Sequence, residues 1–316
     1  MFRLYCGLVR DDIWYNYAEV QPITGGTLAL MDGADKSAPG RSLNLVKGSV
    51  KSLFTKEGLE YELKEEDYKD LKFVDGWKVA REYSRLHTGE DRPKFEEYFF
   101  CKVCSTRGNE RYTKVEESLD DLIDKGLIDE IFAESPDDFI VSTELPLPIE
   151  IDNDKTKIHA TLTKINREIL SFGQVISLSK NAWANESEAN LVWASWDAQI
   201  KSIDGLTERE LNILKRNHQE NFSKKYIVDQ DNIDAMNENE PNLGLVAEHR
   251  PVSCKHCGNE VGGYVDFTNF FSFLSRKRSG RQEKTVEGKT RSSIPSSGVQ
   301  TKKSKQTGDQ PDLSMS

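Results

Sequence analysis

Two Cys-x-x-Cys pairs constrain the fold of this chain more than any other sequence feature. They are Cys101-Lys-Val-Cys104 and Cys254-Lys-His-Cys257, and each follows an extended apolar lead and precedes a glycine-containing turn. In such a turn the two thiolates point to one side and backbone amides point at the sulfurs. Two turns facing each other would place four thiolates in a tetrahedron, which suits Zn²⁺ with Zn–S distances of about 2.3 Å. The spacing therefore predicts one zinc site made by Cys101, Cys104, Cys254 and Cys257.

The predicted ligands are far apart in the sequence, since 149 residues separate Cys104 from Cys254. The metal would tie together the two ends of a large insertion, so its binding would couple to folding. Four thiolates leave no coordination position for water. We therefore expect the Zn²⁺ to be structural and not catalytic.

Three other interpretations of the cysteine pairs stay open at the sequence level. The pairs could be redox dithiols, although neither lies in a clear strand-to-helix context. Each pair could bind its own metal with further ligands, and His249 and His256 lie near the second pair. All four could also be unligated thiols. The fifth cysteine, Cys6, is predicted to be a buried or free thiol.

Composition excludes several classes of protein. The chain has 316 residues, of which 36% are hydrophobic and 30% are charged, and no apolar run approaches the ~18 residues of a membrane span. Five Trp, ten Tyr and 14 Phe argue against a fully disordered chain. The N-terminus lacks the apolar core and cleavage site of a secretory signal, which predicts an intracellular protein.

The net charge of −10 conceals an asymmetry. Residues 275–316 contain ten basic and four acidic residues, a formal charge of +6, which leaves −16 for the rest of the chain. This tail is nearly devoid of apolar residues, so we predict that it is disordered. It is either a solvated tail or a segment that contacts nucleic acid. The acidic remainder favours proteins as partners, because phosphate binding relies on positive surface.

The overall pattern predicts an α+β fold. Its mixed domain would hold a split, zinc-ribbon-like Cys₄ knuckle site. We expect a mixed N-terminal region at 1–100, a helical insertion bracketed by the two knuckles at 101–274, and the disordered basic tail at 275–316.

Hydrophobic spacing and turn residues predict the individual elements. We expect helices at 62–72, 76–87, 114–133 and 157–172. Two further helices, beginning at the capping boxes Asn185–Glu188 and Thr207–Glu210, would form an αα-hairpin around Gly205 and end near Lys225. The expected extended segments are Thr27–Met31, an alternating stretch from Leu43 to Val50, and an edge or crossing segment at 139–151, where two prolines exclude a central strand.

Catalytic motifs are absent from this sequence. Gly33–Ser42 departs from a P-loop in spacing and in its basic residue, and Asp229–Asp234 lacks the central glycine of a calcium loop. The scattered histidines come with no nucleophile–base pattern. We therefore predict no catalytic residue and a protein that is not an enzyme.

Four segments carry a resemblance to a known family. They are Val20–Gly25, the proline-punctuated Leu145–Ile149, the knuckle Cys254–Gly258 and a closing Val265–Phe271 with paired phenylalanines. Together with the helical stretches between them, they resemble the baseplate hub and hub-assembly proteins of contractile-tailed phages, over residues 15–274. The resemblance implies a structural component or chaperone of baseplate assembly, with the knuckle cysteines as metal ligands.

The predicted function is therefore that of a structural or assembly protein stabilised by structural zinc, at a phage tail baseplate. Its expected partners are other baseplate or tail proteins, with no membrane. Its expected location is the bacterial host cytoplasm during assembly, or the tail baseplate of the virion. The first alternative is a zinc-ribbon protein that binds nucleic acid through residues 275–316, and the second is an enzyme with an unrecognised active site.

Overall fold

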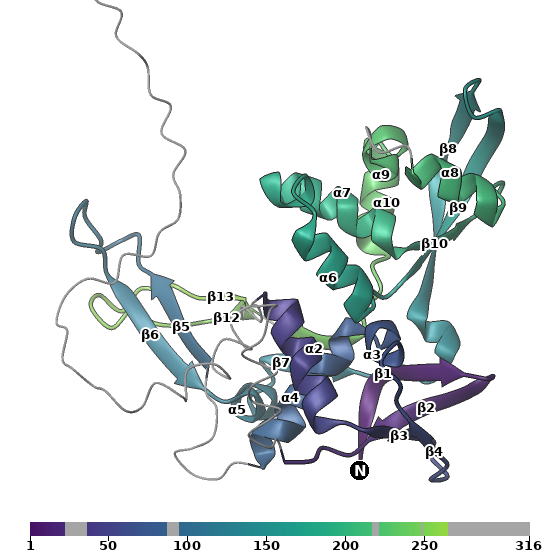
Figure 1. The fold of residues 1–316 in the computed structure, drawn as a ribbon. Coiled ribbons are helices and arrows are strands. Elements are labelled where there is room, and N and C mark those ends of the chain that lie inside the picture. The colour runs from purple at the N-terminus through teal and green to yellow at the C-terminus, as the bar shows by residue number, and fades with distance from the viewer. Residues whose placement is uncertain (23–36, 87–94, 217–220, 248, 265–316) are drawn as a thin grey trace, which may run out of the picture. The chain divides into compact units, whose positions relative to one another are not determined.

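The computed structural model describes most of the chain before residue 265. The described ranges are 1–22, 37–86, 95–216, 221–247 and 249–264. The predicted strand Thr27–Met31, the tail 275–316 and the segment Val265–Phe271 lie outside them. Helices and strands both contribute to the described chain (Figure 1), which confirms the α+β class. Within these ranges, none of the helices combines the length and apolar character that a membrane span needs.

The N-terminal part of the chain forms a four-stranded antiparallel sheet, ordered β1-β2-β3-β4. Asp11 and Asp12 connect β1 to β2 with φ angles of 50° and 61°, the left-handed pair that a tight hairpin turn requires. Helix α2 packs against α4, and α4 packs against β1. The bounds are β1 Phe2–Arg10, β2 Ile13–Ala18, α2 Ala38–Ser49, β3 Ser52–Phe54, β4 Glu60–Glu62, α3 Asp67–Asp70 and α4 Phe73–Arg85.

A buried carboxylate holds an irregularity in β1. Asp75 of α4 accepts hydrogen bonds from the backbone amides of Cys6 (2.9 Å) and Gly7 (2.8 Å), where the register of β1 with β2 shifts. Gly7 has a φ of +79°, and a Cβ there would lie 2.3 Å from the carbonyl oxygen of Tyr15, so the position requires glycine. Burial raises the pKa of Asp75 to about 7. Cys6 is buried in this core, as predicted.

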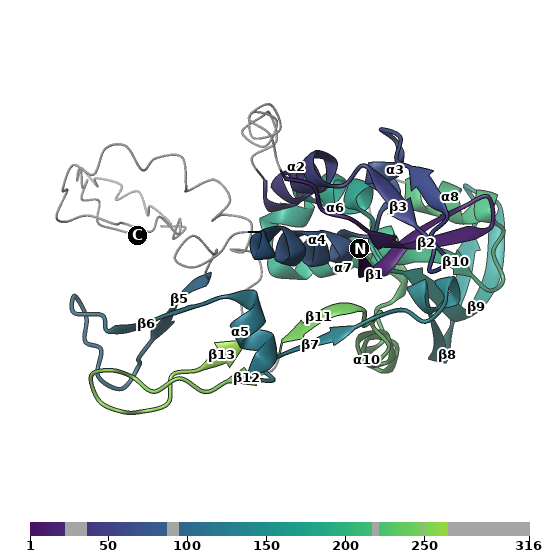
Figure 2. The same cartoon turned by 90° about the horizontal axis from the view of Figure 1, so that it is seen from below.

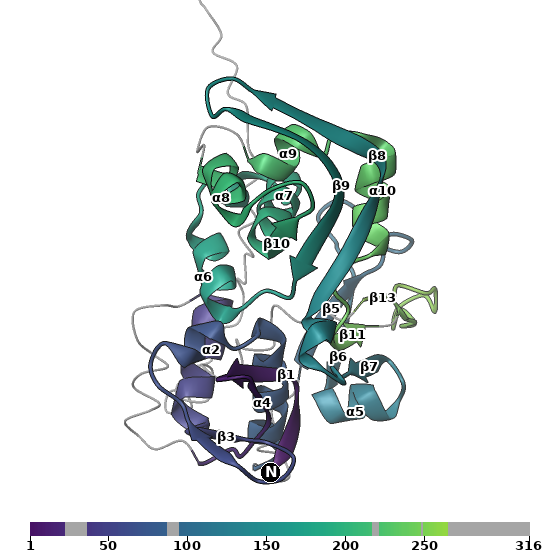
Figure 3. The ribbon, with the colours of Figure 1, turned by 90° about the vertical axis from the view of Figure 1, so that its right-hand side faces the viewer.

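A second sheet, ordered β10-β9-β8, is packed against helices (Figure 3). Helix α10 contacts β8, α7 contacts β9, and α8 contacts β10. Their shared hydrophobic core includes Leu162, Trp196 and Met236. The bounds are η2 Pro136–Phe139, β8 Ile140–Asn153, β9 Ile158–Glu168, α6 Phe172–Lys180, η3 Ala184–Glu186, α7 Glu188–Gln199, β10 Ile200–Ile203, α8 Glu208–Arg216, α9 Phe222–Tyr226 and α10 Gln230–Glu238.

The prediction of an edge segment at 139–151 is confirmed, because β8 lies at the edge of this sheet. Its register against β9 shifts between Glu144 and Ile149, where the two prolines stand. Asn232 of α10 forms hydrogen bonds with the backbone groups of β8 that are not paired with β9 there. Its side chain accepts from the amide of Leu147 (3.0 Å) and donates to the carbonyl of Leu147 (2.9 Å).

The predicted helix at 157–172 is wrong, since these residues form strand β9 up to Glu168. The buried positions Ile158 and Leu162 follow strand alternation, but the alternation changes phase before Ile165. This change lies opposite the register shift of β8. A strand that changes phase in this way places apolar residues at spacings of four, three and four, which imitates helical spacing.

The predicted helix at 114–133 is also wrong in most of its length. The chain forms β6 (Tyr112–Glu117), a short α5 (Leu119–Asp124) and β7 (Ile128–Ile131) instead. Ser118 and Asp121 form a capping box that starts α5. Gly126 then takes a φ of +65°, which redirects the chain after two turns of helix.

Two smaller predictions near the N-terminus need correction. The stretch from Leu43 to Val50 is not extended but belongs largely to α2, whose N-cap Ser37 accepts from the amide of Gly40. The helix predicted at 62–72 is reduced to α3, while the helix predicted at 76–87 is confirmed as α4.

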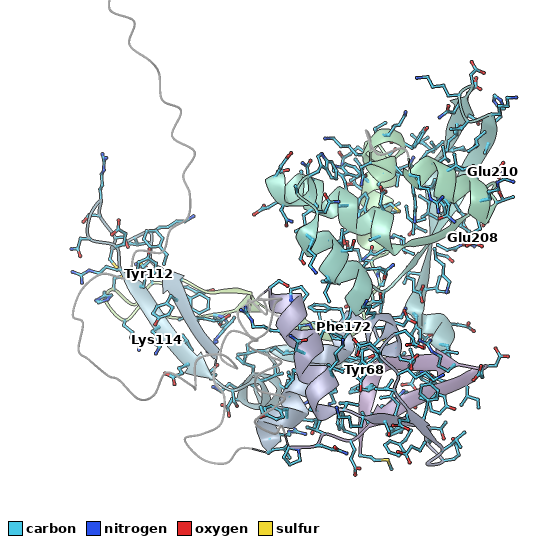
Figure 4. The ribbon with its side chains drawn as sticks, in the orientation of Figure 1. Tyr68, Tyr112, Lys114, Phe172, Glu208 and Glu210 are labelled. Atoms are coloured by element: carbon cyan, nitrogen blue, oxygen red, sulfur yellow. The ribbon has the colours of Figure 1, made fainter. Side chains whose placement is uncertain are left out.

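The predicted αα-hairpin is interrupted by a strand. Helix α7 begins after the N-cap Ser187 rather than at Asn185, and the chain continues from it as β10, which pairs with β9. The capping box at Thr207 is confirmed, since its Oγ1 accepts from the amide of Glu210 at 3.3 Å and its amide donates to the carboxylate of Glu210 at 2.9 Å. Glu210 is labelled in Figure 4. The prediction of one helix up to Lys225 is wrong, because Asn221 is the N-cap of a separate helix, α9.

The chain between the two cysteine pairs therefore contains strands as well as helices, which corrects the prediction of a helical insertion. Three two-stranded antiparallel ladders complete the described fold (Figure 2). They pair β5 with β6, β7 with β11, and β12 with β13. The bounds not yet given are β5 Phe95–Phe100, β11 Gly244–Ala247, β12 His249–Arg250 and β13 Gly263–Tyr264.

Candidate metal centre

The first cysteine pair lies in the loop of the β5–β6 hairpin. The backbone amide of Cys101 donates to the carbonyl of Arg111 (2.9 Å), which extends the ladder to the first ligand. The chain then turns, and the amide of Ser105 donates a hydrogen bond to the carbonyl of Cys101 (3.2 Å). Gly108 completes the loop with a φ of +83°. Cys101 and Cys104 are thereby placed on one tight turn.

The second pair lies between β12 and β13 and is built in the same way. The amide of Cys254 donates to the carbonyl of Asn259 (2.8 Å), and the amide of Gly258 donates to the carbonyl of Cys254 (2.9 Å). Gly258 has a φ of +75° and open space around it, so its conformation and not crowding favours glycine. The predicted knuckle turn is present in both pairs.

The two knuckles meet, as predicted. The four sulfurs of Cys101, Cys104, Cys254 and Cys257 all lie within 4.8 Å of one another. The sulfurs of Cys101 and Cys257 are 3.6 Å apart, and so are those of Cys104 and Cys254. A zinc tetrahedron with Zn–S bonds of about 2.3 Å has sulfurs about 3.8 Å apart. The donor set and its spacing therefore fit a tetrahedral metal held by four thiolates.

The surroundings of the sulfurs favour thiolates on the second knuckle. The backbone amide of His256 donates to the sulfur of Cys254 (3.4 Å) and lowers the pKa of this thiol to about 6. The backbone and side-chain amides of Asn259 lower the pKa of Cys257. Desolvation and the other three sulfurs raise the pKa of Cys104 to about 12. A cation is needed to hold all four groups as thiolates.

A buried arginine links β12 to the β5–β6 hairpin. Arg250 of β12 forms ion pairs with Glu97 of β5 (3.2 Å) and Glu117 of β6, and its guanidinium lies 6.0 Å from the ring centroid of Phe99. Sequence reasoning missed this residue. No local signal could reveal it, because its two carboxylates lie 153 and 133 residues away in the chain.

The geometry bears on the alternatives for the cysteines. Both sulfur contacts of 3.6 Å join one knuckle to the other, which is the arrangement of a shared site. Among the described residues, no histidine belongs to this cluster. His256 is exposed and contributes its backbone amide rather than its ring.

A second group of metal-ligand types lies at the tip of the β8–β9 hairpin. Asp152, Asp154 and His159 are exposed there, and Nδ1 of His159 lies 2.6 Å from a carboxylate oxygen of Asp152. Exposed acidic groups of this kind are common, so the group carries no assignment.

A cavity of about 600 Å³ lies between β1, η2 and β9. Five of its charged side chains form ion pairs with one another. Lys72 and Lys201 pair with Glu168 (2.6 and 3.4 Å), and Arg10 pairs with Asp70 (2.6 Å). These ion pairs neutralise much of the charge in the cavity, and we assign no function to it.

No family model matches the chain, and neither the curated proteins nor the solved structures contain a match.

Proposed function

We propose that the chain is a structural or assembly protein whose four cysteines hold one structural Zn²⁺. The observation that carries the proposal is the joining of two distant knuckles around a single set of four sulfurs. Four thiolates saturate a tetrahedral zinc and leave no position for substrate or activated water. What the metal does here is join the β5–β6 and β12–β13 hairpins.

The partners proposed for this protein are the baseplate or tail proteins of a contractile-tailed phage. The sequence resemblance to baseplate hub proteins supports these partners. The protein would act in the host cytoplasm during assembly or within the tail baseplate. The formal charge of −16 before residue 275 also favours protein partners over nucleic acid for most of the surface.

Affinity purification of the full-length protein from phage-infected cells tests this function. We expect tail or baseplate proteins, identified by mass spectrometry, to co-purify with the wild-type chain. The Cys104→Ser variant should lose them, because its hairpins are no longer joined. The His256→Ala variant should retain them, because only its exposed ring is removed.

Two results would contradict the proposal. One is a zinc-loaded, folded protein that purifies without any structural partner. The other is a gene neighbourhood that encodes no tail-tube, sheath or baseplate protein.

A further inference from the structure

The second sheet buries an arginine that lacks a carboxylate partner. Arg167 of β9 is 0% exposed, and its Nη2 donates to the carbonyls of Met236 and of Asn239 (3.0 Å), at the C-terminal end of α10. Its Nε and Nη1 have no hydrogen-bond partner among the described residues. Glu240, whose charge raises the pKa of Arg167, is exposed. A guanidinium keeps its positive charge in proteins, so this charge is buried without a carboxylate in contact.

Two further buried donors without partners in the described chain lie beside this guanidinium. Trp196 of α7 is 2% exposed, its ring centroid lies 5.7 Å from the guanidinium carbon, and its Nε1 is unpaired. Thr143 of β8 is 0% exposed, and its Oγ1 is unpaired. Val141 pairs with Arg167 in the ladder, so Thr143 is the diagonal neighbour of Arg167 on the same face of the sheet.

Gln199 of α7 completes this group, which we call the Arg167 cluster: Thr143, Arg167, Trp196 and Gln199. Gln199 lies one helical turn beyond Trp196, and its Oε1 is buried and unpaired within the described ranges. A rotation of its amide by 180° would present the NH₂ group instead. The other unpaired atoms of the cluster are those of hydrogen-bond donors. Strands β8 and β9 and helices α7 and α10, which surround the cluster, are labelled in Figure 3.

The acidic side chains next to the cluster in the sequence are engaged elsewhere. Glu168 forms ion pairs with Lys72 (2.6 Å) and Lys201 (3.4 Å). Asp197 accepts hydrogen bonds from the amide (2.8 Å) and the hydroxyl of Ser223. The cluster therefore keeps the positive charge of its guanidinium.

The chemistry of the cluster decides what can satisfy it. Buried polar groups in folded proteins are nearly always hydrogen-bonded. A water molecule accepts few of these hydrogen bonds and brings no charge. A monovalent anion accepts hydrogen bonds from several donors at once and also neutralises the guanidinium.

We infer that the Arg167 cluster binds a small monovalent anion of the size of chloride, between β9 and α7. Arg167, Trp196 and Thr143 donate hydrogen bonds to it. These three side chains are at most 2% exposed, so the bound anion is shielded from solvent, which suits a single halide ion better than a larger oxyanion. The inference goes beyond the structural role proposed above and does not depend on it or on zinc.

Thermal unfolding of the full-length, zinc-loaded protein tests the inference, with sodium chloride replacing sodium gluconate at constant ionic strength. An anion that binds only the folded state raises the Tm as its concentration rises. The Tm of the wild type should therefore rise with chloride, and Arg167→Met should abolish this rise. Arg216→Met changes an exposed arginine of α8 and should keep it.

Thr143→Val removes one donor but keeps the shape of the side chain and the charge of Arg167. This variant keeps the test decisive even where Arg167→Met does not fold. It should weaken the affinity for chloride, obtained from the chloride dependence of the Tm, about threefold or more. Ser142→Ala, at an exposed position of the same strand, should leave the affinity unchanged.

Quenching by iodide locates the site. Iodide quenches an indole ring that it contacts, and Trp196 is shielded from quenchers in solvent because it is 2% exposed. At constant ionic strength, iodide should quench a saturable part of the wild-type fluorescence, and chloride should compete with it. Trp196→Phe should lose this saturable part.

A Tm that rises with chloride, with this pattern among the variants, supports the inference. A wild-type Tm that does not rise, or iodide quenching with no saturable part, would mean that water satisfies the cluster and would overturn the inference. A rise that Arg167→Met and Thr143→Val both retain in full would also overturn it, because the anion would then bind elsewhere.

Discussion

Each ligand cysteine matters individually, because a tetrahedral zinc cannot exchange a thiolate for a hydroxyl without losing affinity. We expect the wild-type protein to contain about one zinc per chain. Cys104→Ser or Cys257→Ser should release it. His256→Ala should retain it, although this residue stands between two ligands.

Metal analysis of the purified proteins by mass spectrometry checks this expectation. A Cys104→Ser protein that kept one zinc per chain would contradict the shared site.

Arg250 of β12 stabilises the contact with the β5–β6 hairpin through two partly buried carboxylates, Glu97 and Glu117. Replacing it by Gln should leave both without their common partner and lower the free energy of unfolding by about 2–3 kcal/mol. Arg107→Gln is the matched control, because Arg107 is exposed in the loop of the β5–β6 hairpin that carries Glu97 and Glu117. Its effect should stay within about 0.5 kcal/mol.

Urea unfolding monitored by intrinsic fluorescence measures both variants. Equal stability of Arg250→Gln and the wild type would show that the arginine does not join the hairpins.

Glu130 gives the stability a defined pH dependence. Desolvation opposes its ionisation, but Lys78 (2.9 Å), Arg81 and the hydroxyl of Tyr5 (2.7 Å) lower its pKa to about 2. A lowered pKa means that the folded state binds the proton less readily than the unfolded state. The stabilisation by Glu130 is thus complete above about pH 4.5 and is lost as the pH falls toward 2.

Glu130→Gln should therefore be less stable than the wild type at pH 6, and the difference should shrink between pH 4.5 and 2. Unfolding by urea at several pH values measures this difference. Glu134→Gln serves as the control, since Glu134 is largely exposed. A difference that did not change with pH would rule out a lowered pKa at Glu130.

At the scale of elements, the bulge of β8 depends on one side chain of α10. Asn232 is 1% exposed and bonds both the amide and the carbonyl of Leu147. Asn232→Ala leaves these two backbone groups without their partner, so we expect a loss of about 2–3 kcal/mol. Asp234→Ala, on the exposed side of the same helix, should change stability by less than about 0.5 kcal/mol.

Thermal unfolding compares these two variants. A similar effect of both would mean that Asn232 does not support the bulge.

The element scale is also where sequence reasoning failed most clearly. The segment from Ile158 was predicted as a helix because its apolar residues recur at spacings of four and three. The bulge in its partner strand produces the same spacings in a strand. A bulge depends on both strands, so the spacing within one segment cannot reveal it. The helix start at Thr207 was predicted correctly, because its capping residues are local.

At the scale of the whole molecule, the four-cysteine cluster stands apart from the two hydrophobic clusters. The cluster built on the first sheet and the cluster built on the second contain none of the four ligand cysteines. The sequence suggested that the metal ties together the two ends of a large insertion and that its binding couples to folding. From the structure we instead expect that removal of zinc separates the β5–β6 and β12–β13 hairpins and leaves both hydrophobic clusters packed.

Limited proteolysis after chelation by 1,10-phenanthroline tests this expectation. New cleavage sites should fall within 95–117 and 249–264, and the fluorescence of Trp196 in the second cluster should not change. Rapid cleavage throughout 140–240 would show that the metal supports the whole fold.

The sequence by itself determined the features that depend on short stretches of chain. These are the two knuckle turns, the choice of the four cysteines that come together, the exclusion of a central strand by two prolines, and the capping box at Thr207. Only the tertiary structure decided which segments are strands where a bulge disguises the alternation, and that Arg250 joins the hairpins. The physical reason is range: a turn or a cap is stabilised by contacts within a few residues, whereas a bulge or a buried ion pair depends on groups that only folding brings together.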